Sequence, residues 1–136
     1  MSNLKAQGNA SGTGTHTLQS ANTNSNRTAT LPDADTTLGY LNVPVSSTTT
    51  TMATSDVGKV ISLSAGITIP NSTFAAGDVV SLYNNTSGSL TITCTITTAY
   101  IAGTNTDQAT VSLATRGVAT VLFISGTECV ITGNVS

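Results

Sequence analysis

Eight residues near the middle of the chain, Leu90 to Thr97, alternate strictly between apolar side chains and threonine. Successive side chains of a β-strand point to opposite faces. The pattern therefore places the four threonines on one face, and on the other Leu90, Ile92, Cys94 and Ile96. Such alternation is typical of a strand that covers a core with one face and meets water with the other.

Six other short runs show strand periodicity, and turn-forming Gly, Asn and Ser residues separate them. No segment has helical periodicity for more than a turn. Short strands spaced about 8–12 residues apart predict an all-β fold, an antiparallel β-sandwich of jelly-roll-like form, over residues 46–136. The predicted strands are Lys59–Ser64, Gly66–Pro70, Asp78–Asn84, Ser89–Thr97, Ala109–Leu113, Gly117–Ser125 and Thr127–Thr132.

One of these runs, Val118 to Ile124, is apolar on both faces over its latter half. A sandwich of this size buries only one face of each strand, so the second apolar face needs another partner. We expect Val121 and Phe123 on the outer face, where they would form a subunit interface.

Residues 1–45 have a different character, with few bulky apolar side chains. These side chains are too far apart to bury a core among themselves. The Thr-rich alternation nevertheless suits extended strands, so we expect an extended N-terminal arm that becomes ordered by pairing with other chains. Its expected anchors are Leu18, Leu31, Leu38 and Leu41.

Charged residues make up only 7% of the chain, and threonine and serine are its commonest residue types. A surface with so little charge offers little repulsion to copies of itself, which favours packing against identical neighbours. The formal net charge of −2 leaves no basic patch, so nucleic acid is not an expected partner. The sequence has neither a signal-peptide pattern nor an 18-residue apolar run, so we expect synthesis in a cytoplasm and no membrane partner.

Reactive side chains are few. His16 is the only histidine, so it is the only candidate base for a serine or cysteine nucleophile. On a three-fold axis it would meet its own copies and could bind a metal, but an ordinary hydrogen-bonded histidine is the favoured interpretation. Asp33 and Asp35 could contribute to a calcium site, although a turn after Pro32 is favoured over it. We expect no enzymatic activity, no metal and no cofactor.

The two cysteines, Cys94 and Cys129, lie among inward-facing residues of predicted strands. Buried free thiols that pack as small apolar groups are the favoured state, because a cytoplasm disfavours a disulfide.

Two stretches together resemble phage virion proteins over about half of the chain. The first, GTGTHTLQSANTNSNRTATLPDADTTLGYL from Gly12 to Leu41, is similar to a repeat of tail fibres and virion spikes, broadly G-x-G-T-x-T-L and then R-T-x-T-L-P-D-A-x-G-T-L. Thr36 stands where that repeat usually has glycine. The second stretch, IAGTNTDQATVSLATRGVATVLFISGTECVITG, resembles the closing strands of small β-domains in phage fibre and capsid-decoration proteins.

The resemblance implies a non-enzymatic virion structural protein. The favoured member is a trimeric capsid decoration (cement) protein on the outer capsid surface, whose arm binds across major capsid proteins and stabilises the shell. The alternative is a short tail or head fibre protein whose knob binds a host-surface polysaccharide, although few aromatic residues are available to stack on sugars. A glycan-degrading enzyme is disfavoured, because the six acidic residues are dispersed.

Overall fold

The structure is a computed structural model, and it describes residues 11, 13 and 42–136. The chain divides into two units, Met1–Thr36 and Thr37–Ser136, and residues 42–136 belong to the second. These residues contain nine strands and one 3-10 helix, η1 (Thr54–Asp56). The all-β class is thus confirmed. The strands are β1 (Val45–Ser46), β2 (Val60–Leu63), β3 (Ile67–Ile69), β4 (Val79–Asn84), β5 (Leu90–Cys94), β6 (Thr98–Ile101), β7 (Thr110–Leu113), β8 (Val118–Ser125) and β9 (Glu128–Gly133).

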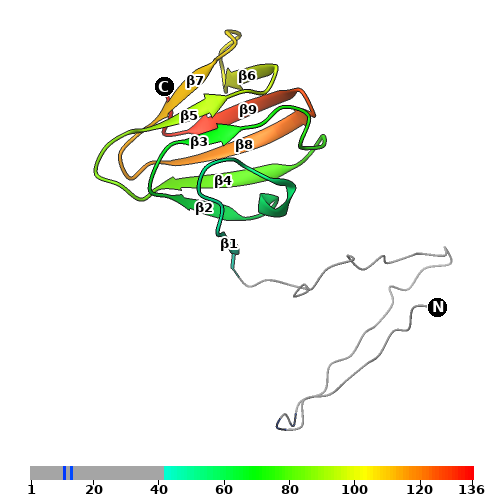
Figure 1. Cartoon of the computed structure of the whole chain (residues 1–136), viewed down its shortest axis with the longest axis vertical. Coiled ribbons are helices and arrows are strands. Elements are labelled where there is room, and N and C mark those ends of the chain that lie inside the picture. Colours follow the sequence, from blue (N-terminus) through cyan, green and yellow to red (C-terminus); the bar gives the residue numbers. More distant parts are fainter. Residues whose placement is uncertain (1–10, 12, 14–41) are drawn as a thin grey trace, which may run out of the picture. The chain divides into compact units, whose positions relative to one another are not determined.

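The strands form two sheets (Figure 1). One sheet has six strands in the order β1-β2-β4-β8-β9-β6, and the other has three in the order β3-β5-β7. Inward side chains of both sheets meet in one hydrophobic core, together with Met52, Phe74 and Ile96 from the connections. Burying each large apolar side chain contributes roughly 1.5–3 kcal/mol, which makes this shared core the main source of stability.

Both sheets are mixed, so the predicted antiparallel arrangement is wrong. The β4–β8, β5–β7 and β8–β9 pairs are antiparallel, whereas the β1–β2, β2–β4, β3–β5 and β6–β9 pairs are parallel. The reason lies in the connections. After β2 the chain crosses to the other sheet for β3 and returns as β4, and such a crossover places β2 and β4 side by side in the same direction. A period-two pattern carries no information about strand direction.

All seven predicted strands are present, but two strands were not anticipated. β1 is only two residues long and spans the expected boundary between the arm and the knob. β6 follows directly after the long alternating run, which ends as a strand at Cys94. The backbone N–H groups of Thr95 and Ile96 both donate to the Ile69 carbonyl, so the chain turns there although Ile96 remains buried.

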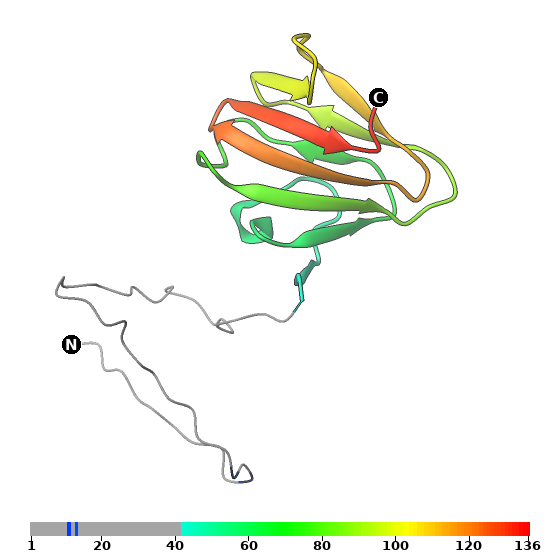
Figure 2. The same ribbon diagram turned by 180° about the vertical axis from the view of Figure 1, so that it is seen from behind.

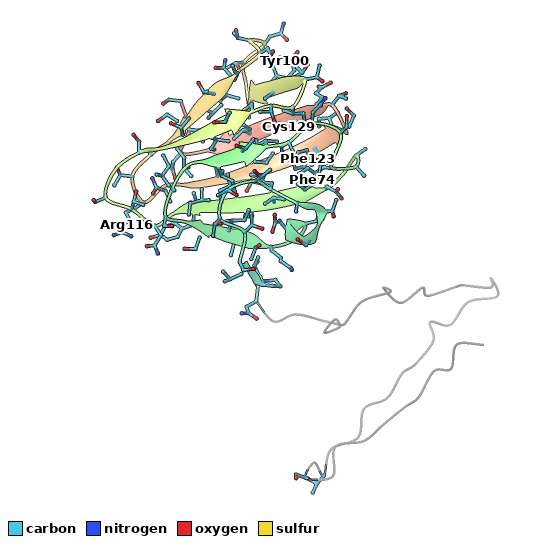
Figure 3. All side chains as sticks on the ribbon, viewed as in Figure 1. Phe74, Tyr100, Arg116, Phe123 and Cys129 are labelled. Atoms are coloured by element: carbon cyan, nitrogen blue, oxygen red, sulfur yellow. The ribbon has the colours of Figure 1, made fainter. Side chains whose placement is uncertain are left out.

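The expectation that Val121 and Phe123 lie on an outer face is wrong. Both side chains are 0% exposed within a single chain. Phe123 stacks on Phe74 inside the core with ring centroids 3.9 Å apart (Figure 3). β8 does have two apolar faces, as predicted, but its outer face is the other one. The exposed large side chains of β8 are Val118, Leu122 and Ile124.

Candidate functional site

The side of the six-stranded sheet that points away from the core is called the outer face. Strand register defines its members, and within β2, β4, β8 and β9 they alternate with buried residues. Figure 2 shows this side of β4, β8 and β9 from behind, with no other described segment across it. Its members are Val45, Val60, Ser62, Val79, Ser81, Tyr83, Thr98, Tyr100, Val118, Thr120, Leu122, Ile124, Glu128, Val130 and Thr132.

An apolar row crosses the outer face. Leu122 of β8 is paired with Val79 of β4 on one side and with Val130 of β9 on the other, and Val130 is paired with Tyr100 of β6. Leu122 is 40% exposed, and Ile124, at the bulge where β8 shifts register, is 45% exposed. Aliphatic side chains are thus contiguous over three strands, and the aromatic ring of Tyr100 extends the row to a fourth, which is unusual for a face that meets only water.

Charge is almost absent from the outer face. Glu128 is its single carboxylate, and it carries no lysine, arginine or histidine. Between the apolar groups lie hydroxyls from Ser62, Ser81, Thr120 and Thr132. The opposite side of the molecule differs, because the outward side chains of the three-stranded sheet are hydroxyls alone, namely Thr68, Thr91, Thr93, Thr110 and Ser112.

The sheet edges differ in how far the chain covers them. At β3, the Met52 N–H donates to the Thr68 carbonyl and the Thr68 N–H donates to the Thr50 carbonyl. At β7, Ser136 and Ser112 exchange two backbone hydrogen bonds. At β6, the Asp107 carboxylate accepts the Ala99 N–H at 2.8 Å, and the Gln108 N–H donates to the Ala99 carbonyl.

The edge at β1 stands apart. Within residues 42–136, no backbone hydrogen bond reaches the side of β1 that faces away from β2. This edge is where the segment preceding Val45 joins the sheet.

A buried carboxylate, Asp56, holds the segment that links β1 to β2. It is 0% exposed and accepts hydrogen bonds from the hydroxyls of Ser46 and Thr48, the latter at 2.7 Å, and from the Ala53 N–H at 2.7 Å. Burial by itself raises the pKa of Asp56, but these bonds and the charge of Lys59 outweigh it and lower the pKa below its ordinary 3.8. Asp56 therefore stays ionised and ties β1 to the sheet.

This arrangement predicts an acid-sensitive contribution to stability. Because the pKa of Asp56 is lower in the folded than in the unfolded state, its contribution is complete above pH 3.8 and is lost as pH falls through the folded value. Asp56→Ala should reduce the free energy of unfolding by about 1.5–3 kcal/mol at pH 7, since three bonds to a charged acceptor disappear. Urea titrations at pH 7 and pH 3 measure both effects.

Asp56→Asn is the matched control. Its amide oxygen can accept the Ala53 N–H while its NH₂ group donates to the two hydroxyls, so the geometry is retained without the titration. We expect Asp56→Asn to lose less stability than Asp56→Ala at pH 7, and to lose less than the wild type between pH 7 and pH 3. Equal losses for the wild type and Asp56→Asn over that range would contradict the assignment.

A buried side-chain amide, that of Asn84, organises the C-terminal end of β4. Its Nδ2 donates to the carbonyls of Gly88 and Ala114 at 2.8 and 2.9 Å, and its Oδ1 accepts the N–H and hydroxyl of Thr86. Asn84 thereby joins the turn that contains Thr86 and Gly88 to the turn that begins at Ala114. The second turn presents Arg116, whose Nη1 donates to the Asn85 side chain at 2.6 Å (Figure 3).

The two cysteines are buried free thiols, as the alternation indicated. Burial, with a further contribution from the Asp107 charge, raises the pKa of Cys94 to about 11. The pKa of Cys129 rises to about 12 for the same main reason. Protonated thiols at these depths are poor nucleophiles and poor metal ligands, so both residues act in packing.

The remaining sequence candidates lie outside the described residues. These are the expected arm anchors Leu18, Leu31, Leu38 and Leu41, and the weighed alternatives at His16, Asp33 and Asp35. In the part of the chain that the structure describes, no three His, Cys, Asp or Glu side chains are grouped as a metal site would require. No helix there has the length and apolar character to span a bilayer.

Sequence reasoning missed Asp56, Asn84 and the outward residues of β8. A signal for Asn84 existed, because the alternation of Val80 and Leu82 continues inward to it. For β8, the size of Phe123 indicated which face points inward, since the bulkiest side chain gains most free energy from burial. Nothing in the pattern around Asp56 marked it as buried.

No protein-family model matches the chain, and no curated protein or solved structure shows significant similarity to it.

Proposed function

We propose that the chain is a non-enzymatic virion structural protein of a phage, a trimeric decoration (cement) protein on the outer capsid surface. The observation that carries the proposal is the edge of β1 at the point where the N-terminal segment joins the sheet, since residues 42–136 place no backbone hydrogen bond on its side away from β2. The other three sheet edges have backbone partners from their own chain. An exposed strand edge next to a Thr-rich segment favours attachment to another protein by β-augmentation.

In this proposal residues 46–136 form a sandwich-like, jelly-roll-like knob, and residues 1–45 form the arm that crosses major capsid proteins. Leu18, Leu31, Leu38 and Leu41 bury their side chains on the shell. Each arm contributes a modest contact, and linking three arms through one trimer turns them into a tight attachment. Asp56 supports this role mechanically, because its hydrogen bonds hold Ser46 and hence the base of the arm to the knob.

A tail or head fibre protein whose knob binds a host-surface polysaccharide is the second candidate. The observation that favours it is the position of Tyr83 and Tyr100, both half-buried on the outer face. An aromatic ring whose side is accessible can stack on the apolar side of a sugar.

Particles produced with a version of the protein that lacks residues 1–40 separate the two candidates. We expect the shortened protein to be absent from purified particles, and the particles to release their genome at a lower temperature than the wild type. A protein that binds only the intact shell stabilises it by mass action. Attachment should also depend weakly on salt, because apolar anchors and backbone bonds are little affected by screening.

Adsorption to the host, measured on the same particles, is the control. Unchanged heat-induced genome release together with failed adsorption would contradict the decoration role and support the fibre role. The number of copies per particle is an independent measurement, since a shell-covering protein requires many more copies than a fibre.

A further inference from the structure

We propose that the outer face of the six-stranded sheet is the interface between copies of this chain. The proposal names the surface and the partner for the trimer, and in that sense it rests on the proposed function. The centre of the interface is Leu122, in a strand that has neighbours on both sides, with Val79 and Val130 beside it in the same row.

The exposed apolar side chains support this choice of surface. The described residues have six exposed large hydrophobic side chains, and four of them belong to the outer face. They are Val45 at 69%, Val118 at 50%, Ile124 at 45% and Leu122 at 40%. An apolar area collected on one face, while the opposite sheet shows only hydroxyls, marks the face that leaves water on association.

The chemistry of the outer face fits a second copy better than a foreign protein. Two copies of a charged face bring like charges together, which costs several kcal/mol for a close pair. Here Glu128 is the only charge, and it stands at the start of β9 rather than in the apolar row.

The polar groups of the face are self-complementary as well. Ser62, Ser81, Thr120 and Thr132 each carry a hydroxyl that both donates and accepts, so each can bond to an identical group on a copy. In an ordinary protein about a quarter of the residues are charged. If such a protein bound here, its charged side chains would be buried against the outer face without a partner of opposite charge.

The flat extent of the outer face accounts for about half of a standard interface. Six strands about 4.8 Å apart span about 24 Å, and five residues along a strand span about 17 Å, which gives a flat area of roughly 400 Å². Projecting side chains increase the accessible area beyond the flat value. A standard interface buries about 800 Å² per partner, so the face supplies a large share of one.

Leu122→Asp tests the proposal, with Thr91→Asp as the matched control. Both positions lie on inner strands of their sheets and both are exposed, but Thr91 is on the three-stranded sheet. Native mass spectrometry and light scattering of the full chain at micromolar concentration give the oligomeric state. We expect an oligomer for the wild type and for Thr91→Asp, and a dissociation constant raised by at least about 30-fold for Leu122→Asp.

Folding is checked by circular dichroism, and Ile124→Asp, at the more exposed bulge position, replaces Leu122→Asp if the latter does not fold. A monomeric wild type would overturn the proposal, and so would a folded Leu122→Asp or Ile124→Asp protein that remains an oligomer. The two proposals fail separately. A wild-type monomer that still stabilises particles contradicts the interface and the trimeric state but not the decoration role, whereas an oligomer that never binds particles contradicts only the decoration role.

Discussion

Replacement of Phe123 by alanine is expected to lower the free energy of unfolding by about 3–5 kcal/mol. Phe123 is 0% exposed, and its ring lies on that of Phe74 with an interplanar angle of 16°. Truncation removes the buried ring and leaves a cavity between two elements that relax only in part. Proteins of this size are stable by about 5–15 kcal/mol, so one substitution would remove a large part of the total.

Urea denaturation followed by circular dichroism measures the effect, with two controls. Phe123→Leu retains much of the volume and should lose less stability than the alanine variant. Ile124→Ala, one residue along β8 but on the outer face, should change the stability of the separated chain only slightly. Equal losses for Phe123→Ala and Ile124→Ala would contradict the assignment of the two faces of β8.

Gly133→Ala is expected to lower stability by at least about 2 kcal/mol, from two separate causes. Gly133 has φ +126, a conformation that side chains with a Cβ rarely adopt. A Cβ there would also press against the Val118 carbonyl oxygen and lie 2.8 Å from Ala119 Cα, on the neighbouring strand. Only glycine allows β9 to approach β8 so closely at this point.

Gly88→Ala is the matched control for Gly133→Ala. No atom lies within 4 Å of the Cβ it would introduce, and its φ is outside the left-handed region. We expect stability to be unchanged or to rise by up to about 1 kcal/mol, because alanine reduces the freedom of the unfolded chain. Thermal melts of both variants under one condition give the comparison, and a melting temperature for Gly133→Ala equal to that of Gly88→Ala would refute the close approach.

The number and position of the main strands could be predicted because they depend on local pattern. The alternation of Ile92 and Cys94 with threonine shows which side chains face inward, and the turn residues Asn85 and Gly88 mark where a strand must stop. These properties need only the two-residue period of a strand and the chemistry of turns. The short strands β1 and β6 lack such a signal, since their pairing comes from neighbours distant in sequence.

The candidate interface shows the limit of the same reasoning. The sequence indicates that β8 has two apolar faces, yet the choice between Phe123 and Leu122 as the outward residue depends on the register of β8 with β4 and β9. A change of register by one residue would exchange the two faces completely.

By itself, the sequence determined the all-β class, the positions of seven of the nine described strands, the burial of both cysteines and the scarcity of charge. Each of these follows from residue type and local spacing. Only the tertiary structure decided the parallel pairs, the outward face of β8 and the burial of Asp56. These properties arise where segments distant in the chain meet, and the free energy of their packing and hydrogen bonding does not appear in any local pattern.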